Sequence, residues 1–520
     1  MTFTELLATL RERNVQLWAD GDRLGYRAAP GAMTAELLES LRRHKHDLMA
    51  FLAEAQAADR ATRPLRPVAR DRDLPLSPSQ DLLWRLERLS NGGPLYNIAV
   101  VLWLDGRIDV EALRRSFQEI VSRHEVLRTK FAVRGGQPVQ VIEPPTRFDL
   151  PVVDLRCLAE ELRAQEASRK IAIEARIPFN LARDLMLRAK LFRLDAARHA
   201  LFLNVHHIAA DGWSLGILYR ELVAAYDAFS IGRPPSLPEI PVQFADFGVW
   251  QRDGFETEGV DEHIAYWRKR LSGAPPLLTL PTDRPRPASQ SFRGAFETAR
   301  LSTKLLDAVK ALAEQEGCSL YMILLAAFQV LLGRCSGQTD VVVGSPIAGR
   351  CVVEVEQLIG FFVNTLVLRA DLTGPQTFRK FLAQVRNTTL EANAHQDLRF
   401  EKLVEELKPA RDLAYNPVFQ AMFSLDNTLT APARMGEMQM SVERISSGTS
   451  KFDITLFASD TPDGLQLLVE FSTDIFDRST VRNWLGNYRQ ILEEAVAFPD
   501  TGLVELLSRD VQQSPDLAKS

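Results

Sequence analysis

Several features that would place a chain of 520 residues in a simple class are scarce or missing. There are four cysteines and none of them is in C-x-x-C spacing: Cys157, Cys318, Cys335 and Cys351. Cysteines this sparse are typical of reducing compartments, and we expect them to be small core residues rather than a disulfide framework. The N-terminus lacks a basic segment followed by an apolar one, so no secretory signal is indicated and we expect a cytoplasmic protein.

Long hydrophobic runs and an excess of one charge are also missing. The longest apolar stretch, residues 321–333, is interrupted by Gln329 and falls short of the about 20 residues that a membrane span needs, so it predicts a buried helix and no membrane partner. The net charge is −5 with both signs interspersed, which argues against nucleic-acid binding. Hydrophobic residues at 46% and charged residues at 25% are typical of globular proteins, and the length predicts two or three packing units.

The first 55 residues have the pattern of a small α-β-β-α domain. Leucines at helical spacing follow Thr2-x-x-Glu5, two alternating segments flank Asp20-Gly21, and a second helix is expected after Thr34. So small a unit buries a thin core, and it would gain from self-association or from a partner strand at the hairpin edge. The basic cluster at 42–46 fits either a solvated helix face or a binding patch. We therefore expect docking, with a homodimer as one form of it.

The remaining chain alternates strand and helix patterns. Residues 56–73 are rich in Ala, Arg and Pro and predict a linker. From there we expect an α/β (α+β) protein with two lobes, 74–250 and 251–508, and a tail at 509–520 that leads toward a further domain. Expected strands include 98–104, 201–205 and 340–344, and expected helices include 110–124, 215–229, 301–316 and 320–332.

Two adjacent histidines mark a candidate site where an apolar strand ends. Residues 201–205 run into His206-His207 and then Ile208-Ala209-Ala210-Asp211-Gly212. Neighbouring strand side chains point to opposite faces, so one histidine faces a cavity and the other faces the packing. A neutral imidazole, with an ordinary pKa of about 6.5, can accept a proton at neutral pH. A metal site would need further converging ligands, and the neighbouring residues supply none, so no metal is expected.

Seven segments together resemble one enzyme family. HHIAADG is similar to the HHxxxDG motif of the condensation domains of nonribosomal peptide synthetases and their chloramphenicol-acetyltransferase-like relatives. Six further segments follow the family order. They are SPSQDLLW (77–84, with Ser79 for Ala and Leu82 for Arg), RHEVLRTKF (123–131), FADFGVW (244–250), IGFFVNTL (359–366), HQDLRFE (395–401, with Arg399 for Pro) and RDLAYNP (411–417). The resemblance covers about residues 73–505, and the first 55 residues resemble TubC-type docking domains.

The resemblance implies a fold and a set of roles. It implies two chloramphenicol-acetyltransferase-like lobes in a V arrangement, with a tunnel between them. By this resemblance His207 faces the tunnel as a base or a positioning group, His206 belongs to the same motif, and Gly212 offers a backbone N–H to an oxyanion. Asp211 is implied to be structural, and we expect Arg128 rather than Arg123 as its ion-pair partner. Asn364 is expected either to close the tunnel from the second lobe or to be an ordinary strand-end amide.

The resemblance also implies the reaction and its partners. A carrier-bound aminoacyl amine would attack an acyl or peptidyl thioester, with substrates on phosphopantetheine arms and no cofactor bound by this chain. The implied partners are an acceptor carrier protein, a donor carrier protein or an acyl-CoA, and the C-terminal tail of an upstream synthase at the docking domain. His206-His207 disfavours a heterocyclisation domain, and the N-terminal docking segment disfavours an epimerisation domain. We expect the elongation subtype. The alternatives are a starter domain using acyl-CoA, a non-catalytic recruitment domain and a free-standing acyltransferase.

Overall fold

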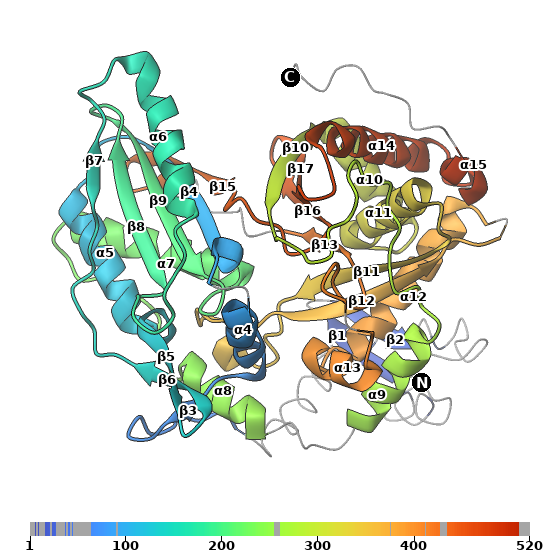
Figure 1. Cartoon of the computed structure of the whole chain (residues 1–520), viewed down its shortest axis with the longest axis horizontal. Helices are drawn as coiled ribbons and strands as arrows, with labels where there is room; N and C mark the ends of the chain where they lie inside the picture. Colours follow the sequence, from blue (N-terminus) through green and yellow to red (C-terminus); the bar gives the residue numbers. More distant parts are fainter. Residues whose placement is uncertain are drawn as a thin grey trace. The chain divides into compact units, whose positions relative to one another are not determined.

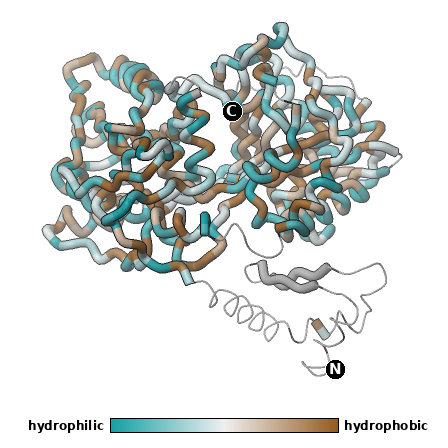
Figure 2. The backbone as a smooth tube through the Cα atoms, turned by 60° about the horizontal axis from the view of Figure 1, so that its bottom comes forward, coloured by the Kyte–Doolittle hydropathy of each residue, from teal (hydrophilic) through white to brown (hydrophobic). Residues whose placement is uncertain are grey.

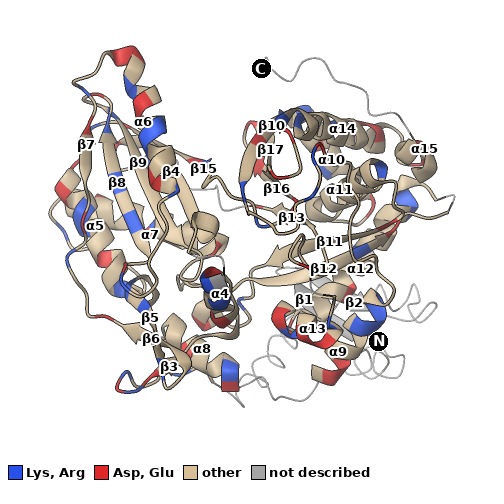
Figure 3. Cartoon of the chain, viewed as in Figure 1, with Lys and Arg blue, Asp and Glu red and all other residues tan. Residues whose placement is uncertain are grey.

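The computed structural model places the chain in two compact units, Met1–Arg66 and Pro67–Ser520. It describes residues 64–89, 92–253, 260–374, 376–410, 412–426 and 434–508, together with two N-terminal strands and the single residues 6, 9, 37, 40, 41 and 44. The expected tail at 509–520 lies outside the described residues. Basic and acidic residues are interspersed along the ribbon of the larger unit (Figure 3).

The smaller unit contains the expected hairpin. Strand β1 (Gln16–Asp20) pairs antiparallel with β2 (Arg23–Arg27), and Asp20 lies opposite Arg23. The expected turn pair Asp20-Gly21 falls partly outside the described residues, because Asp20 ends β1 and residues 21 and 22 are not described. The two expected flanking helices fall largely outside the described residues, but Leu6, Leu37 and Leu41 are described and buried.

The first half of the larger unit is built on a six-stranded sheet (Figure 1). Its strand order is β14-β15-β4-β9-β8-β7. The strands from this half of the chain are β4 (Asn97–Asp105), β7 (Val152–Asp154), β8 (Leu187–Arg193) and β9 (Arg198–His206). Helix α6 (Glu160–Ala175) buries Ala167 and Ile171 against Val101 and Phe202 of the sheet, while α5 (Val110–Arg123) and α7 (Gly212–Ser230) pack on each other.

The second half carries its own six-stranded sheet. The order is β10-β17-β16-β13-β11-β12, formed by β10 (Gly294–Leu301), β11 (Asp340–Ile347), β12 (Asn364–Asp371), β13 (Ala421–Leu425), β16 (Ile454–Thr461) and β17 (Gly464–Ser472). Its core helices are α10 (Thr303–Gln315), α11 (Leu320–Ser336), α12 (Phe378–Ala394) and α14 (Arg478–Ala497). Helix α11 is buried from Met322 to Arg334, which explains its nearly continuous apolar sequence.

One excursion joins the two sheets. Strands β14 (Arg434–Met435) and β15 (Met438–Ile445) follow β13 in sequence, yet β15 pairs antiparallel with β4 of the first sheet. The expected second lobe, 251–508, therefore supplies the edge of the first lobe's sheet. The chain returns to the second sheet at β16, so the segment between Ile445 and Ile454 runs from one lobe to the other.

The remaining elements frame these sheets. A three-stranded sheet consists of β3 (Leu74–Pro75), β5 (Thr129–Arg134) and β6 (Gln137–Ile142). The other helices are α4 (Pro78–Leu89), α8 (Phe244–Asp253), α9 (Val260–Leu271), α13 (Phe400–Leu407) and α15 (Leu503–Ser508), and short 3-10 turns cover 94–96, 125–128 and 353–355. Every helix and strand range that the sequence predicted between 98 and 344 is confirmed, with ends shifted by a few residues.

The expected linker ends earlier than residue 73. Val68 N donates to Asp246 Oδ1 at 2.8 Å, and the Arg70 guanidinium pairs with Asp246 and Glu125. These contacts attach the chain from Pro67 onward to the larger unit.

Hydrophobic and hydrophilic residues alternate along both halves of that unit (Figure 2). Within the described ranges no single helix has the length and apolar composition to cross a membrane, although α10 and α11, at a 104° bend, pass that test together.

Candidate functional site

The two histidines of the motif point into different environments, as the strand geometry predicts. His206 ends β9 and is fully buried, with its ring edge-on to Tyr96 and Phe179. Its Nδ1 accepts from Ile208 N at 3.2 Å, and its Nε2 lies 3.9 Å from a Glu87 oxygen. Burial lowers the pKa of His206 and the nearby Glu87 opposes that shift. His206 therefore supports the turn that follows β9.

His207 lies at the junction of the two lobes and is less buried than His206. Its backbone N–H donates to the Tyr96 carbonyl at 2.8 Å, which anchors it beside the start of β4. Its ring meets the Phe361 ring of the second lobe edge-on, with centroids 5.1 Å apart. Burial lowers the pKa of His207 well below the ordinary value, and Lys451 and His206 lower it further. The imidazole is therefore neutral at pH 7 and can accept a proton.

Asp211 is completely buried and caps the helix that follows the motif. One of its oxygens accepts from Ser214 N at 2.8 Å as the N-cap of α7, and the other accepts from Phe362 N at 3.0 Å. Its cationic partner is Arg350, whose Nη2 lies 3.3 Å from Asp211 Oδ1 and whose side chain is 3% exposed. Because Phe362 and Arg350 both belong to the second lobe, this one carboxylate joins the two lobes.

The expected ion pair between Arg128 and Asp211 is wrong. Arg128 donates to the Glu143 carbonyl, and its nearest carboxylate oxygen, on Glu125, is 3.9 Å away. The physical reason is the position of the segment: the 3-10 turn at 125–128 leads into β5, and its arginine reaches the end of β6 instead of the motif. Arg350 lies in none of the motif segments described above. Its only indication is that a fully buried carboxylate requires a cation, and that requirement does not say which residue of the fold supplies it.

Asn364 uses its amide to hold backbone, so the strand-end interpretation fits its contacts. It begins β12, its Nδ2 donates to the Gln396 and Leu398 carbonyls at 2.8 and 3.0 Å, and its Oδ1 accepts from Phe400 N at 3.0 Å. These bonds tie the IGFFVNTL segment to the HQDLRFE segment.

Gly212 is the first residue of α7, so its N–H lies at the helix end that carries partial positive charge.

A cation that the sequence did not single out lies close to the histidines. Lys451 is on the segment that runs between the lobes, its Nζ is 5.3 Å from the Tyr96 ring centre, and its backbone N–H donates to Glu470 Oε1 at 3.2 Å. Burial lowers the pKa of Lys451 to about 8, and burial raises the pKa of Glu470. A lone lysine far from the motif in sequence gives no signal of this position.

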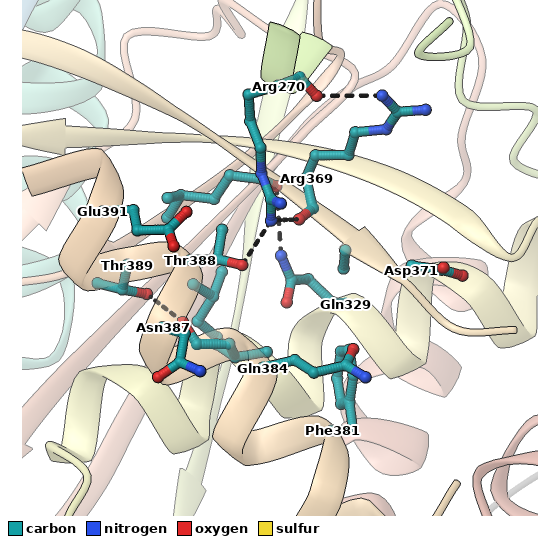
Figure 4. Close-up of a pocket in the computed structure, with 14 residues that line it drawn as sticks. Arg270, Gln329, Arg369, Asp371, Phe381, Gln384, Asn387, Thr388, Thr389 and Glu391 are labelled. Atoms are coloured by element: carbon teal, nitrogen blue, oxygen red, sulfur yellow. Dashed lines mark hydrogen bonds between the residues drawn. The ribbon is translucent and has the colours of Figure 1, made fainter. Parts of the chain in front are cut away.

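Two other features are separate from the histidine motif. Among the described residues, no three His, Cys, Asp or Glu side chains lie close enough together to hold a metal ion. A polar cavity of about 240 Å³ lies between α12 and β12, where Arg270 donates to Thr388 Oγ1 at 2.5 Å and to the Arg369 carbonyl at 3.2 Å (Figure 4). None of the expected site residues lines that cavity.

Comparisons with known proteins show which families this chain is similar to. Residues 70–515 match the condensation-domain model, and residues 4–54 match the TubC N-terminal docking domain. A linear gramicidin synthase protein of Brevibacillus parabrevis is 46% identical over 446 residues, which are 85% of this chain and 6% of that protein. Chondramide synthase cmdD of Chondromyces crocatus is 43% identical over 449 residues, 86% of this chain and 12% of that protein. The chain thus spans a small part of the length of these relatives.

Solved structures extend the comparison to both lobes. The X-domain from teicoplanin biosynthesis has a TM-score of 0.75 at 30% identity and covers 85% of this chain and 98% of its own. The first condensation domain of the calcium-dependent antibiotic synthetase has a TM-score of 0.73 at 23% identity, over 84% of this chain and 99% of its own, and supports the fold alone. The expected fold class is confirmed. The chain belongs to the condensation-domain family of nonribosomal peptide synthetases, which are amide-forming acyltransferases, and carries a TubC-type docking domain ahead of it.

Proposed function

We propose that this chain is an elongation condensation domain, which joins a carrier-bound acyl or peptidyl thioester to a carrier-bound aminoacyl amine. The observation that carries the proposal is the position of His207 at the junction of the lobes: its backbone N–H donates to the Tyr96 carbonyl, its ring packs on the Phe361 ring, and burial lowers its pKa. The donor and acceptor would arrive on phosphopantetheine arms, and the chain itself would bind no cofactor.

In the proposed reaction the amine nitrogen attacks the thioester carbonyl carbon. The new C–N bond forms as the carbonyl oxygen becomes an oxyanion, and collapse of this intermediate breaks the C–S bond and releases the donor thiolate. His207 accepts the proton that the amine loses and returns one to the thiolate. The Gly212 N–H, at the N-terminus of α7, is the proposed donor to the oxyanion. His206 and Asp211 would not touch substrate and would position this turn.

The docking segment supports a donor delivered by another protein. A TubC-type domain at 4–54, with a two-stranded hairpin, suits a partner segment that adds a strand to the sheet. We propose that this segment is the C-terminal tail of an upstream synthase, with a homodimer as the alternative occupant. A starter domain that uses acyl-CoA would not need such a delivery step.

A recruitment role is the second candidate, because one solved neighbour is an X-domain in complex with OxyB, at a TM-score of 0.75 and 30% identity. The two roles differ in whether the chain forms a bond. His207 and Asp211 are both present, and the hydrogen bonds of Asp211 to Ser214 and Phe362 support the catalytic proposal.

The test is a transfer assay on the whole chain with an aminoacyl-loaded acceptor carrier, offered acyl-loaded carrier or acyl-CoA in separate reactions. Intact-protein mass spectrometry of the acceptor follows the product. We expect transfer from the carrier-bound donor, and we expect His207→Ala to lower the rate by ~10²–10⁴ if the imidazole acts as a base. Transfer from acyl-CoA alone would indicate a starter domain. No transfer across a donor panel would support recruitment.

A further inference from the structure

A buried arginine at the junction of the lobes makes contacts that the site description above does not use. Arg399 is 7% exposed and stands in the HQDLRFE segment where the family pattern has proline. Its Nη1 lies 3.3 Å from the Phe362 carbonyl oxygen and 3.4 Å from that of Val363. It also lies 3.4 Å from Ser79 Oγ, on α4 of the first lobe. Burial lowers the pKa of Arg399.

The other end of the guanidinium is held by α8. When the Gln251 side-chain amide is oriented with its oxygen toward the guanidinium, the orientation that satisfies both groups, that oxygen accepts from Arg399 Nε at 2.9 Å and also from Nη2. No carboxylate lies within ion-pair distance of Arg399 in the described part of the chain. A buried cation held by neutral oxygens from three separate elements fixes the relative positions of those elements, because each oxygen would lose its donor if the group moved.

Two departures from the family pattern thus meet at one point. Ser79 replaces the usual alanine and Arg399 replaces the usual proline, and the serine hydroxyl is one of the oxygens around the guanidinium. The residue after Ser79 reaches the histidine motif, since Gln80 Nε2 donates to the Ile208 carbonyl at 3.1 Å. The pair therefore connects the second lobe to the element that supports the HHIAADG turn.

The backbone that Arg399 holds is the one that contacts the site. The segment from Ile359 to Phe362 is bound from the first lobe through Gly360 N to Ser214 Oγ at 3.1 Å and Phe362 N to Asp211 Oδ2 at 3.0 Å. Phe361 lies between these bonds and packs against His207. Arg399 binds the same segment through the two carbonyls that immediately follow Phe361.

We propose that Arg399 is a positioning residue for amide formation: it holds the Phe361–Val363 backbone at the distance from Asp211 and His207 that the reaction requires. The inference rests on the proposed condensation reaction. It predicts an effect on the rate of the bond-forming step and little effect on carrier binding, because a small displacement of reacting groups can cost up to about 10²-fold in rate.

The most informative variant is Arg399→Pro. Arg399 has φ −68° and ψ 142°, which proline adopts without strain, and its backbone N–H makes no hydrogen bond to a described residue. The substitution therefore removes the side chain while it keeps the backbone. Arg399→Lys is the second variant, since it retains a cation but cannot reach all the oxygens together. Arg268→Met, an exposed arginine of α9 in the same lobe, is the matched control.

Two readouts separate this inference from the proposed function. In the transfer assay we expect Arg399→Pro to lower kcat by ~10-fold or more, with KM for the acceptor carrier within about twofold of the wild type. By hydrogen exchange we expect about tenfold faster exchange at the Gly360 and Phe362 amides and no change in β16 and β17. For Arg399→Lys, kcat and the exchange rates should lie between those of the wild type and of Arg399→Pro. For Arg268→Met, both should match the wild type.

The exchange readout needs no activity, so an inactive wild type would refute the proposed function while still testing Arg399. Unchanged kcat together with unchanged exchange in both Arg399 variants would overturn the positioning role. Faster exchange throughout β16 and β17 would show a general loss of stability and would also overturn it. A double-mutant cycle with Ser79→Ala adds a check: that change should lower kcat in the wild type and have no effect in Arg399→Pro.

Discussion

Replacing Arg350 by methionine tests the ion pair that the fold assigns to Asp211. Arg350 faces Asp211 at 3.3 Å, Ser214 Oγ at 3.0 Å and the Leu358 carbonyl at 2.8 Å, and its guanidinium lies 4.1 Å from the Phe362 ring centre. Methionine keeps the apolar contact with the ring but leaves the fully buried carboxylate without its cation. Breaking one side of a buried pair costs roughly 3–5 kcal/mol.

The matched control is Arg128→Met, which removes the partner that the sequence suggested. Arg128 is 11% exposed on its side chain, donates to the Glu143 carbonyl and has its nearest carboxylate at 3.9 Å. We therefore expect a smaller loss of roughly 1.5–3 kcal/mol, the range for one hydrogen bond that involves a charged group. Urea unfolding of the two variants and the wild type, followed by circular dichroism, measures the differences in the free energy of unfolding. The comparison requires that all three proteins have the same slope of free energy against urea concentration.

The assignment of the ion pair predicts that Arg350→Met loses more unfolding free energy than Arg128→Met. If Arg128→Met destabilised the chain as much as Arg350→Met, the assignment of the pair would be refuted. The double variant Arg350→Met with Asp211→Leu provides a second check, because two apolar side chains leave no uncompensated charge. It should recover part of the stability that Arg350→Met loses.

Two further predictions concern the same junction. Lys451 lowers the pKa of His207, so Lys451→Met should raise that pKa; the neutral base is lost as pH falls through it, and the acid limb of kcat/KM against pH should therefore move to higher pH. A limb that stays in place would show that His207 is not the titrating group. Asn364→Asp replaces the amide that donates to two carbonyls at 2.8 and 3.0 Å by a buried carboxylate, and urea unfolding should show a loss of roughly 3 kcal/mol or more, whereas a loss below about 1 kcal/mol would contradict its bonding role.

Local patterns predicted the elements and the histidine turn well. The runs of strand character at 98–104 and 201–205 predicted β4 and β9, and the nearly continuous apolar stretch at 320–332 predicted the buried helix α11. The different environments of His206 and His207 are consistent with the strand geometry expected for neighbouring residues. Each of these inferences depends on residues that are neighbours in the sequence.

Contacts between distant segments were not predictable in the same way. The edge strand β15 comes from the second half of the chain yet completes the first sheet, and no local pattern indicates which sheet an isolated strand joins. The cation that reaches Asp211 lies 139 positions away, and the nearer arginine, Arg128, was the wrong choice. Lys451 and Arg399 likewise acquire their environments from segments of the other lobe.

The sequence by itself determined the class, the elements, the family and the identity of the two motif histidines, because periodicity, turn chemistry and motif spacing are written in adjacent residues. Only the tertiary structure decided which cation neutralises Asp211, that Asn364 holds backbone, and that Ser79 and Arg399 lie together. The physical reason is that a buried charge or amide is satisfied by whichever donor the packing brings within about 3 Å, and packing is a property of the whole folded chain.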